Sequence, residues 1–160
     1  MKILAVSALL CALMALTTSS MQPVADDDIL DSFEFPWVPI GRRYFYYVTR
    51  PLTWPEAESN CRSLGGHLAS VESLEEYDLM RSLIRGSKSD PLVWLGGCDR
   101  FKEGEWEWID GSPFNFTYWC PAEPNNKRNE DCLQMNFGNC KCWNDKGCGH
   151  RLTSYCIKAS

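Results

Sequence analysis

Apolar residues recur every three or four positions in two segments, residues 53–64 and 73–84, and this period predicts two amphipathic helices. Each segment begins with Ser or Thr followed three residues later by Glu, which is the pattern of a capping box. Gly65 and Gly86 follow the last apolar positions, and we expect them to end the helices.

Short runs of aromatic and β-branched residues lie on both sides of these helices and predict strands. One run, "YFYYV" at residues 44–48, precedes the first helix. The others follow Pro91 and are "LVWLGG", "EWEWID", "DCLQMN", "CKCWND" and "TSYCIK". Helices followed by strands indicate an α+β fold, with two helices packed on small antiparallel sheets. Residues 110–131 form a long predicted loop, and loops of that length are usually functional or disordered.

The start of the chain differs in composition from the rest. Lys2, an apolar run over residues 3–16 and the small residues after it are typical of a secretory signal peptide, residues 1–20. Residues 21–36 are acidic without a sustained period, which predicts a propeptide or flexible lead-in. The folded domain is therefore expected to span residues 37–160. The apolar run is too short to span a membrane, so we expect a secreted, extracellular protein without membrane insertion.

Cysteine content and charge indicate the compartment of the protein and exclude some classes of partner. Of nine cysteines, Cys11 lies in the predicted signal peptide, and the remaining even number indicates disulfides formed in an oxidising compartment. A zinc site is disfavoured because the chain has only two histidines and no paired C-x-x-C. Without Lys2, 15 basic and 21 acidic residues give a charge of −6, which argues against nucleic acid or anionic membrane as a partner.

A set of motifs follows the predicted elements in order from residue 65 to residue 145. They are "GGHLASVES" between the helices, "VWLGG" in a central strand, "WEWIDGSPFNFTYW" entering the long loop, and then "EPN", "EDC" and "WND". With these motifs the chain resembles a C-type lectin domain from about Trp37 to its end, and within that family it resembles the fish type II antifreeze proteins. The resemblance implies a C-type lectin-like fold with a long calcium-binding loop.

The resemblance also implies a disulfide framework. The two main bridges of the family correspond to Cys61–Cys156 and Cys132–Cys148. A further bridge of the antifreeze proteins corresponds to Cys120–Cys142, and Cys98–Cys140 is then the pair that remains. The chain departs from the antifreeze pattern at Asp131, where those proteins carry a cysteine.

The loop "AEPNNKRNEDC", residues 122–132, is rich in the oxygen donors that calcium prefers. In the family, five matching residues surround one calcium ion, and here they are Glu123, Asn125, Glu130, Asn144 and Asp145. In sugar-binding members the peptide bond before the proline, here Pro124, is cis. Glu123, Asn125, Glu130 and Asn144 would also contact the sugar. Glu-Pro-Asn goes with mannose, fucose or N-acetylglucosamine, which predicts a mannose-type lectin for cell-surface or microbial glycans.

Other residues of this region extend or complicate the prediction. The matching positions for a second calcium ion are Asp99, Glu103, Asn126 and Asp131. Lys127 and Arg128 add positive charge near the first site, which weakens cation binding unless they point outward. The interval from Glu123 to Glu130 is one residue shorter than in typical mannose-binding relatives. Asn115 begins an N-glycosylation sequon, Asn-Phe-Thr, and the alternative is an unused sequon in a folded loop.

Three functions remain open at this stage. A calcium-dependent lectin is favoured by the intact "EPN", and an ice-binding protein is supported by the cysteine arrangement and the short loop. A lectin-like fold that binds a protein partner is the third. Trp143 is read as a core residue, His67 as packed and His150 as an exposed loop residue. An enzyme is disfavoured because neither histidine has an evident nucleophile partner. Oligomer formation stays open, since no heptads predict it.

Overall fold

The computed structural model describes residues 37–84 and 90–159. The predicted signal peptide (1–20) and acidic lead-in (21–36) lie outside the described residues. Within the described ranges, no helix has the length and apolar character needed to cross a membrane.

The described residues form two helices and an eight-stranded sheet. The helices are α1 (Trp54–Ser63) and α2 (Leu74–Ile84). The strands are β1 (Val38–Ile40), β2 (Arg43–Leu52), β3 (His67–Leu68), β4 (Val93–Cys98), β5 (Glu107–Trp108), β6 (Cys132–Phe137), β7 (Cys142–Lys146) and β8 (Leu152–Ala159). The sheet order is β1-β2-β8-β4-β6-β7, with β3 paired to β8 and β5 to β4. This is the α+β architecture that the sequence predicted.

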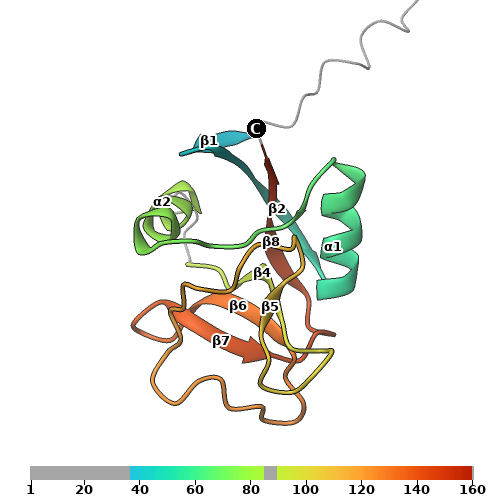
Figure 1. The fold of residues 1–160 in the computed structure, drawn as a ribbon, viewed down its shortest axis with the longest axis vertical. Helices are drawn as coiled ribbons and strands as arrows, with labels where there is room; N and C mark the ends of the chain where they lie inside the picture. Colours follow the sequence, from blue (N-terminus) through green and yellow to red (C-terminus); the bar gives the residue numbers. More distant parts are fainter. Residues whose placement is uncertain (1–36, 85–89, 160) are drawn as a thin grey trace, which may run out of the picture. The chain divides into compact units, whose positions relative to one another are not determined.

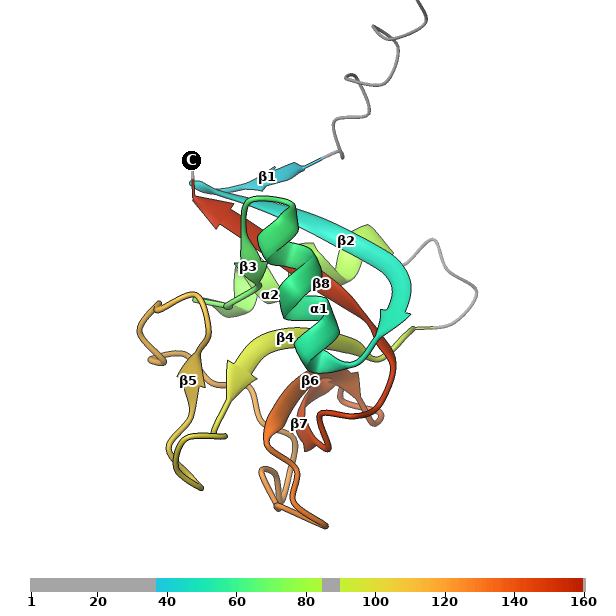
Figure 2. The ribbon, with the colours of Figure 1, turned by 90° about the vertical axis from the view of Figure 1, so that its right-hand side faces the viewer.

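The two helices flank the long strand pair β2–β8, one on each side (Figures 1 and 2). β2 and β8 are antiparallel, whereas β4 pairs with β8 in parallel. The antiparallel strands β6 and β7 lie at the far end from β1, next to the long loop (Figure 1). The long loop therefore lies at the β7 end of the sheet, away from β1.

Helix α1 begins and packs as its sequence pattern predicts. The backbone N–H of Thr53 donates to the Glu56 carboxylate at 2.9 Å, which is one half of the capping box. Trp54, Ala57 and Cys61 are buried on one face. The indole N–H of Trp54 donates to the carbonyl of Leu95 at 2.8 Å, so a large apolar side chain keeps its polar atom satisfied.

Strand β4 runs through the core, and all six of its residues are buried. This burial explains the uninterrupted apolar run "VWLGG". Gly96 is required by close packing, because a Cβ there would lie 2.4 Å from the carbonyl oxygen of Leu68. His67 follows α1 closely in the chain, and its Nδ1 lies 2.7 Å from the Glu58 carboxylate. Its side chain is 44% exposed, so the prediction of a packed histidine is not confirmed.

Three of the four predicted disulfides are present in the structure: Cys61–Cys156, Cys120–Cys142 and Cys132–Cys148. The prediction of Cys98–Cys140 is wrong, because both cysteines are free. Cys98 pairs with Cys132 at the start of β6, whereas Cys140 lies beyond the end of that strand. Five residue steps of β6 separate the two ends by about 17 Å, and a disulfide needs Cα atoms within about 7 Å.

Candidate functional site

The long loop is fastened to β7 where it leaves the aromatic core. The N–H of Cys120 donates to the carbonyl of Trp143 at 2.9 Å, and the N–H of Trp143 donates to the carbonyl of Tyr118 at 2.8 Å. The Cys120–Cys142 disulfide joins the same two segments. Trp143 is fully buried and packs edge-on against Trp119, so it is a core residue as predicted. The residues after Cys120 are thereby held beside Asn144 and Asp145.

The Glu-Pro-Asn motif folds back onto the end of β7. The peptide bond between Glu123 and Pro124 is cis, as the resemblance implied. The side-chain amide of Asn125 donates to a carboxylate oxygen of Glu123. Asp145 is fully buried, and its carboxylate accepts the backbone N–H of Asn125 at 3.0 and 3.1 Å and that of Asn126 at 2.5 Å. Asp145 therefore fixes the backbone conformation of the motif.

One pocket of about 350 Å³ gathers most of the predicted ligands. Glu123, Asn125, Glu130 and Asn144 line it, and they come from the loop and from β7. Asp145 lies beneath this pocket and contacts it through the Asn125 backbone. The structure thus brings together residues that are up to 22 positions apart in the sequence.

The charges of this cluster suit a bound cation. Partial burial, and next the Asp145 carboxylate, raise the pKa of Glu123 to about 7. Two carboxylates at such short range repel one another, and a divalent ion between them would remove that repulsion. In the described part of the chain, no three His, Cys, Asp or Glu side chains converge as a metal site by themselves. Amide oxygens would have to complete the ligand set, which is typical of calcium rather than zinc.

One internal contact competes with a cation at this position. The Lys146 ammonium lies 3.3 Å from a carboxylate oxygen of Glu130. Sequence reasoning missed Lys146 and Phe137, which also line the pocket. The period of two along β7 could have found Lys146, because it is two residues from Asn144 and so shares its face.

The residues predicted for a second ion divide between two places. The Asp99 side chain is buried, with one oxygen accepting the N–H of Gly104 at 2.9 Å and the other oxygen without a hydrogen-bond partner. Desolvation, and then the carboxylates of Asp99 and Asp131, raise the pKa of Glu103. Asn126 instead lies against the first cluster, where its side-chain oxygen accepts the N–H of Glu130 at 3.0 Å. The charges of Asp99 and Asp131 act on Glu103, but among the described residues these carboxylates do not converge as a metal site.

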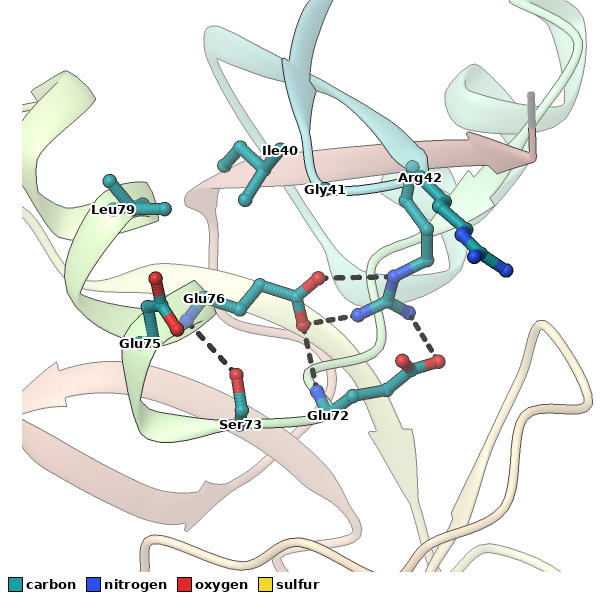
Figure 3. Close-up of a pocket in the computed structure, with 9 residues that line it drawn as sticks. Ile40, Gly41, Arg42, Glu72, Ser73, Glu75, Glu76 and Leu79 are labelled. Atoms are coloured by element: carbon teal, nitrogen blue, oxygen red, sulfur yellow. Dashed lines mark hydrogen bonds and ion pairs between the residues drawn. The ribbon is translucent and has the colours of Figure 1, made fainter.

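A second pocket, of about 300 Å³, lies between the β1–β2 turn and the start of α2 (Figure 3). Its main charges neutralise one another. Arg43 pairs with both oxygens of Glu76, lies 3.2 Å from Glu72, and donates to the Ser70 hydroxyl at 2.7 Å. The Glu76 carboxylate also accepts the backbone N–H of Glu72 at 2.8 Å (Figure 3). This network joins β2 to α2 and is structural.

Comparison with known proteins agrees with the fold and the motifs. The family described as "Lectin C-type domain" matches residues 50–158. The chain belongs to the C-type lectin domain family. As a family member it carries the family's loop architecture, while the ligand class varies among its relatives.

Those relatives include ice-binding and sugar-binding proteins. A "Type-2 ice-structuring protein" of Hemitripterus americanus is 39% identical, over 96% of this chain and 97% of the relative. The structure of a "Ca2+-dependent type II antifreeze protein" superposes with a TM-score of 0.72 at 36% identity, covering 77% of this chain and 97% of that one. A calcium-independent type II antifreeze protein gives 0.69 at 39% identity, covering 77% and 91%. The cow CD23 carbohydrate-recognition domain, solved with GlcNAc2Man3, gives 0.69 at 29% identity, covering 78% and 93%.

Proposed function

We propose that this chain is a secreted, calcium-dependent lectin that binds mannose-type glycans. The supporting observation is the single pocket lined by Glu123, Asn125, Glu130 and Asn144. Fold similarity alone cannot select this function, because the family includes ice-binding proteins. The intact Glu-Pro-Asn motif and its place in the pocket favour sugar.

Five residues would hold the calcium ion. They are Glu123, Asn125, Glu130, Asn144 and Asp145. When bound, calcium would supply coordination positions that two neighbouring sugar hydroxyls complete. The carboxylates accept hydrogen bonds from those hydroxyls and the amide NH₂ groups donate to them, so the same side chains orient ion and sugar. Lys146 would leave Glu130 when the ion binds.

Phe137 gives the pocket an apolar surface. Its side chain is 36% exposed and lines the pocket beside Glu123 and Asn144. Sugars have apolar faces made of C–H groups, and an aromatic ring at the wall of a sugar site can pack against them. This contact supports carbohydrate as the ligand.

Calorimetric titration tests both parts of this proposal. Calcium is titrated into the folded protein, and methyl α-mannoside is titrated into the calcium-loaded protein. We expect calcium binding to weaken at least tenfold in Glu123→Gln, since one charged ligand is lost. Glu105→Gln, an exposed carboxylate outside this pocket, is the control and should bind as the wild type does. Equal affinities of Glu123→Gln and wild type would overturn the placement of the ion.

Ice binding is the second candidate, favoured by the near full-length similarity to the Hemitripterus protein. Inspection of ice crystals grown in the protein's presence decides it. Faceted crystals without mannoside binding would favour this candidate. If calcium stabilises the fold but the protein binds neither sugar nor ice, binding of a protein partner is the remaining candidate function.

Two further expectations accompany the lectin proposal. A second calcium ion would bind among Asp99, Glu103 and Asp131, with the backbone or side chain of Asn126 nearby, and titration should then give more than one site. Asn115 is exposed in the long loop and would accept an N-linked glycan in a secreted chain. A mass increase removed by an N-glycanase would test the latter.

A further inference from the structure

The proposed sugar pocket carries positive charges that the calcium ligands do not need. Lys127 and Arg128 line it, and both are exposed. Within residues 37–84 and 90–159, neither side chain has a hydrogen bond or an ion pair. Lys146 lines the pocket too, but it pairs with Glu130. Two exposed cations of the pocket therefore form no ion pair among these residues, and the Lys127 charge acts on Glu123 only at longer range.

The backbone holds these two cations beside the ligand residues. The N–H of Lys127 donates to the Asn125 side-chain oxygen at 3.0 Å. Arg128 has a φ of +63°, and its neighbour Asn129 has the same value. Left-handed conformations are uncommon for a long side chain such as Arg. The Asn125 side chain thus helps to fix the backbone at Lys127, next to Arg128.

Electrostatics indicates which ligand suits this arrangement. Cations near a divalent ion oppose its binding, so Lys127 and Arg128 are a cost to the calcium site alone. An anionic group on the sugar would offset that cost, and the planar guanidinium of Arg128 suits the oxygens of a sulfate or phosphate. We infer that the pocket prefers glycans whose calcium-bound sugar carries a sulfate or phosphate ester, contacted by Lys127 and Arg128. The inference rests on the proposed lectin function.

Competition on immobilised mannose tests the inference. Protein retained on the resin in calcium is eluted with mannose, mannose 6-sulfate or mannose 6-phosphate at matched ionic strength. We expect at least one anionic sugar to elute the protein at about fivefold lower concentration than mannose, as two exposed ion pairs allow. The ester that elutes the protein at the lower concentration shows whether the pocket prefers sulfate or phosphate.

A double variant assigns the effect to the two cations. Lys127→Gln with Arg128→Gln should remove the advantage of the anionic sugar over mannose, measured in saturating calcium as the ratio of the two eluting concentrations. Arg42→Gln with Lys102→Gln removes the same charge from exposed positions outside this pocket, and it should keep the advantage.

Each outcome of this experiment is decisive. Elution by all three sugars at equal concentration overturns the inference and leaves the lectin proposal standing. Loss of the advantage in the control variant as well shows a nonspecific charge effect, which also overturns it. If wild type is not retained on mannose, the lectin proposal fails and the inference fails with it.

Discussion

Glu123 and Asn125 are the two side chains whose chemistry sets the proposed sugar preference. They lie in one pocket, and the Asn125 amide donates to Glu123. In the family, Gln-Pro-Asp goes with galactose. We therefore expect Glu123→Gln with Asn125→Asp to shift preference from mannose to galactose on a glycan array. Unchanged mannose selectivity in the double variant would count against this site.

The raised pKa of Glu123 predicts opposite effects of pH on the metal-free and calcium-bound protein. Without metal, the folded state holds the Glu123 proton more tightly than the unfolded chain, because burial and Asp145 raise its pKa to about 7. The stability from this group is therefore present at low pH and is lost as pH rises through about 7. Calcium binds the deprotonated carboxylate, so calcium affinity should fall as pH drops from about 8 to about 6.

Two measurements check these signs. Calcium titration at both pH values should give the weaker binding in acid. Urea unfolding in chelator should show a gain in stability on acidification that Glu123→Gln lacks. A Glu123→Gln protein with the same pH response as wild type would show that another group titrates.

The proposed ligand residues were predicted because the family motif fixes them one by one, whereas Lys146 and Phe137, which line the same pocket, were missed. The local sequence does not indicate that the end of β6 lies beside the loop at residue 123. That neighbourhood depends on the register of β6 with β7, in which Phe137 pairs with Cys142. Non-local pairing of this kind cannot be obtained from the spacing of residues along one segment.

At the scale of elements, Arg43 links the start of β2 to the start of α2. Its side chain is 15% exposed and that of Glu76 is 11% exposed. Arg43→Ala leaves the Glu76 carboxylate nearly buried without its partner, so we expect a loss of about 2 kcal/mol in the free energy of unfolding. Arg42→Ala, at the adjacent exposed position, should change stability by less than about 0.5 kcal/mol in the same urea titration. Equal effects would contradict the structural role of the network.

The free cysteines give a second element-scale prediction. Cys140 is exposed beyond β6, whereas Cys98 is buried in β4, and burial raises the pKa of its thiol. A thiol-alkylating reagent without reductant should therefore label Cys140 in the folded protein and Cys98 only after unfolding. Peptide mass mapping identifies both positions. If neither cysteine is labelled after unfolding, the two are joined in a disulfide and this prediction is wrong.

The helices and longer strands were predictable because each carries a local period or composition, as in the buried run of β4. β1 and β3 were not, since they have three and two residues and no period can be measured over so short a length. From "EWEWID" only Glu107–Trp108 became a strand, because the pairing with β4 ends there. The Cys98–Cys140 prediction was wrong because the direction of β6 places Cys132, and not Cys140, beside Cys98.

At the scale of the whole molecule, calcium should stabilise the fold. The proposed ligands come from the long loop and from β7, so an ion that binds only the folded state would add to its stability. At about one hundred times the dissociation constant the gain is about 2.7 kcal/mol, which raises the melting temperature by about 5–10 °C. Calorimetric melting with calcium and with chelator measures this. An unchanged melting temperature would contradict an ion held at this position.

Retention on immobilised mannose is the most direct test of the central claim, that this C-type lectin domain binds mannose-type sugars through calcium. The protein is passed over mannose and galactose resins in calcium and then eluted with chelator. We predict retention on mannose, none on galactose, and release by the chelator. Absence of retention on mannose, or retention that survives the chelator, would contradict the claim.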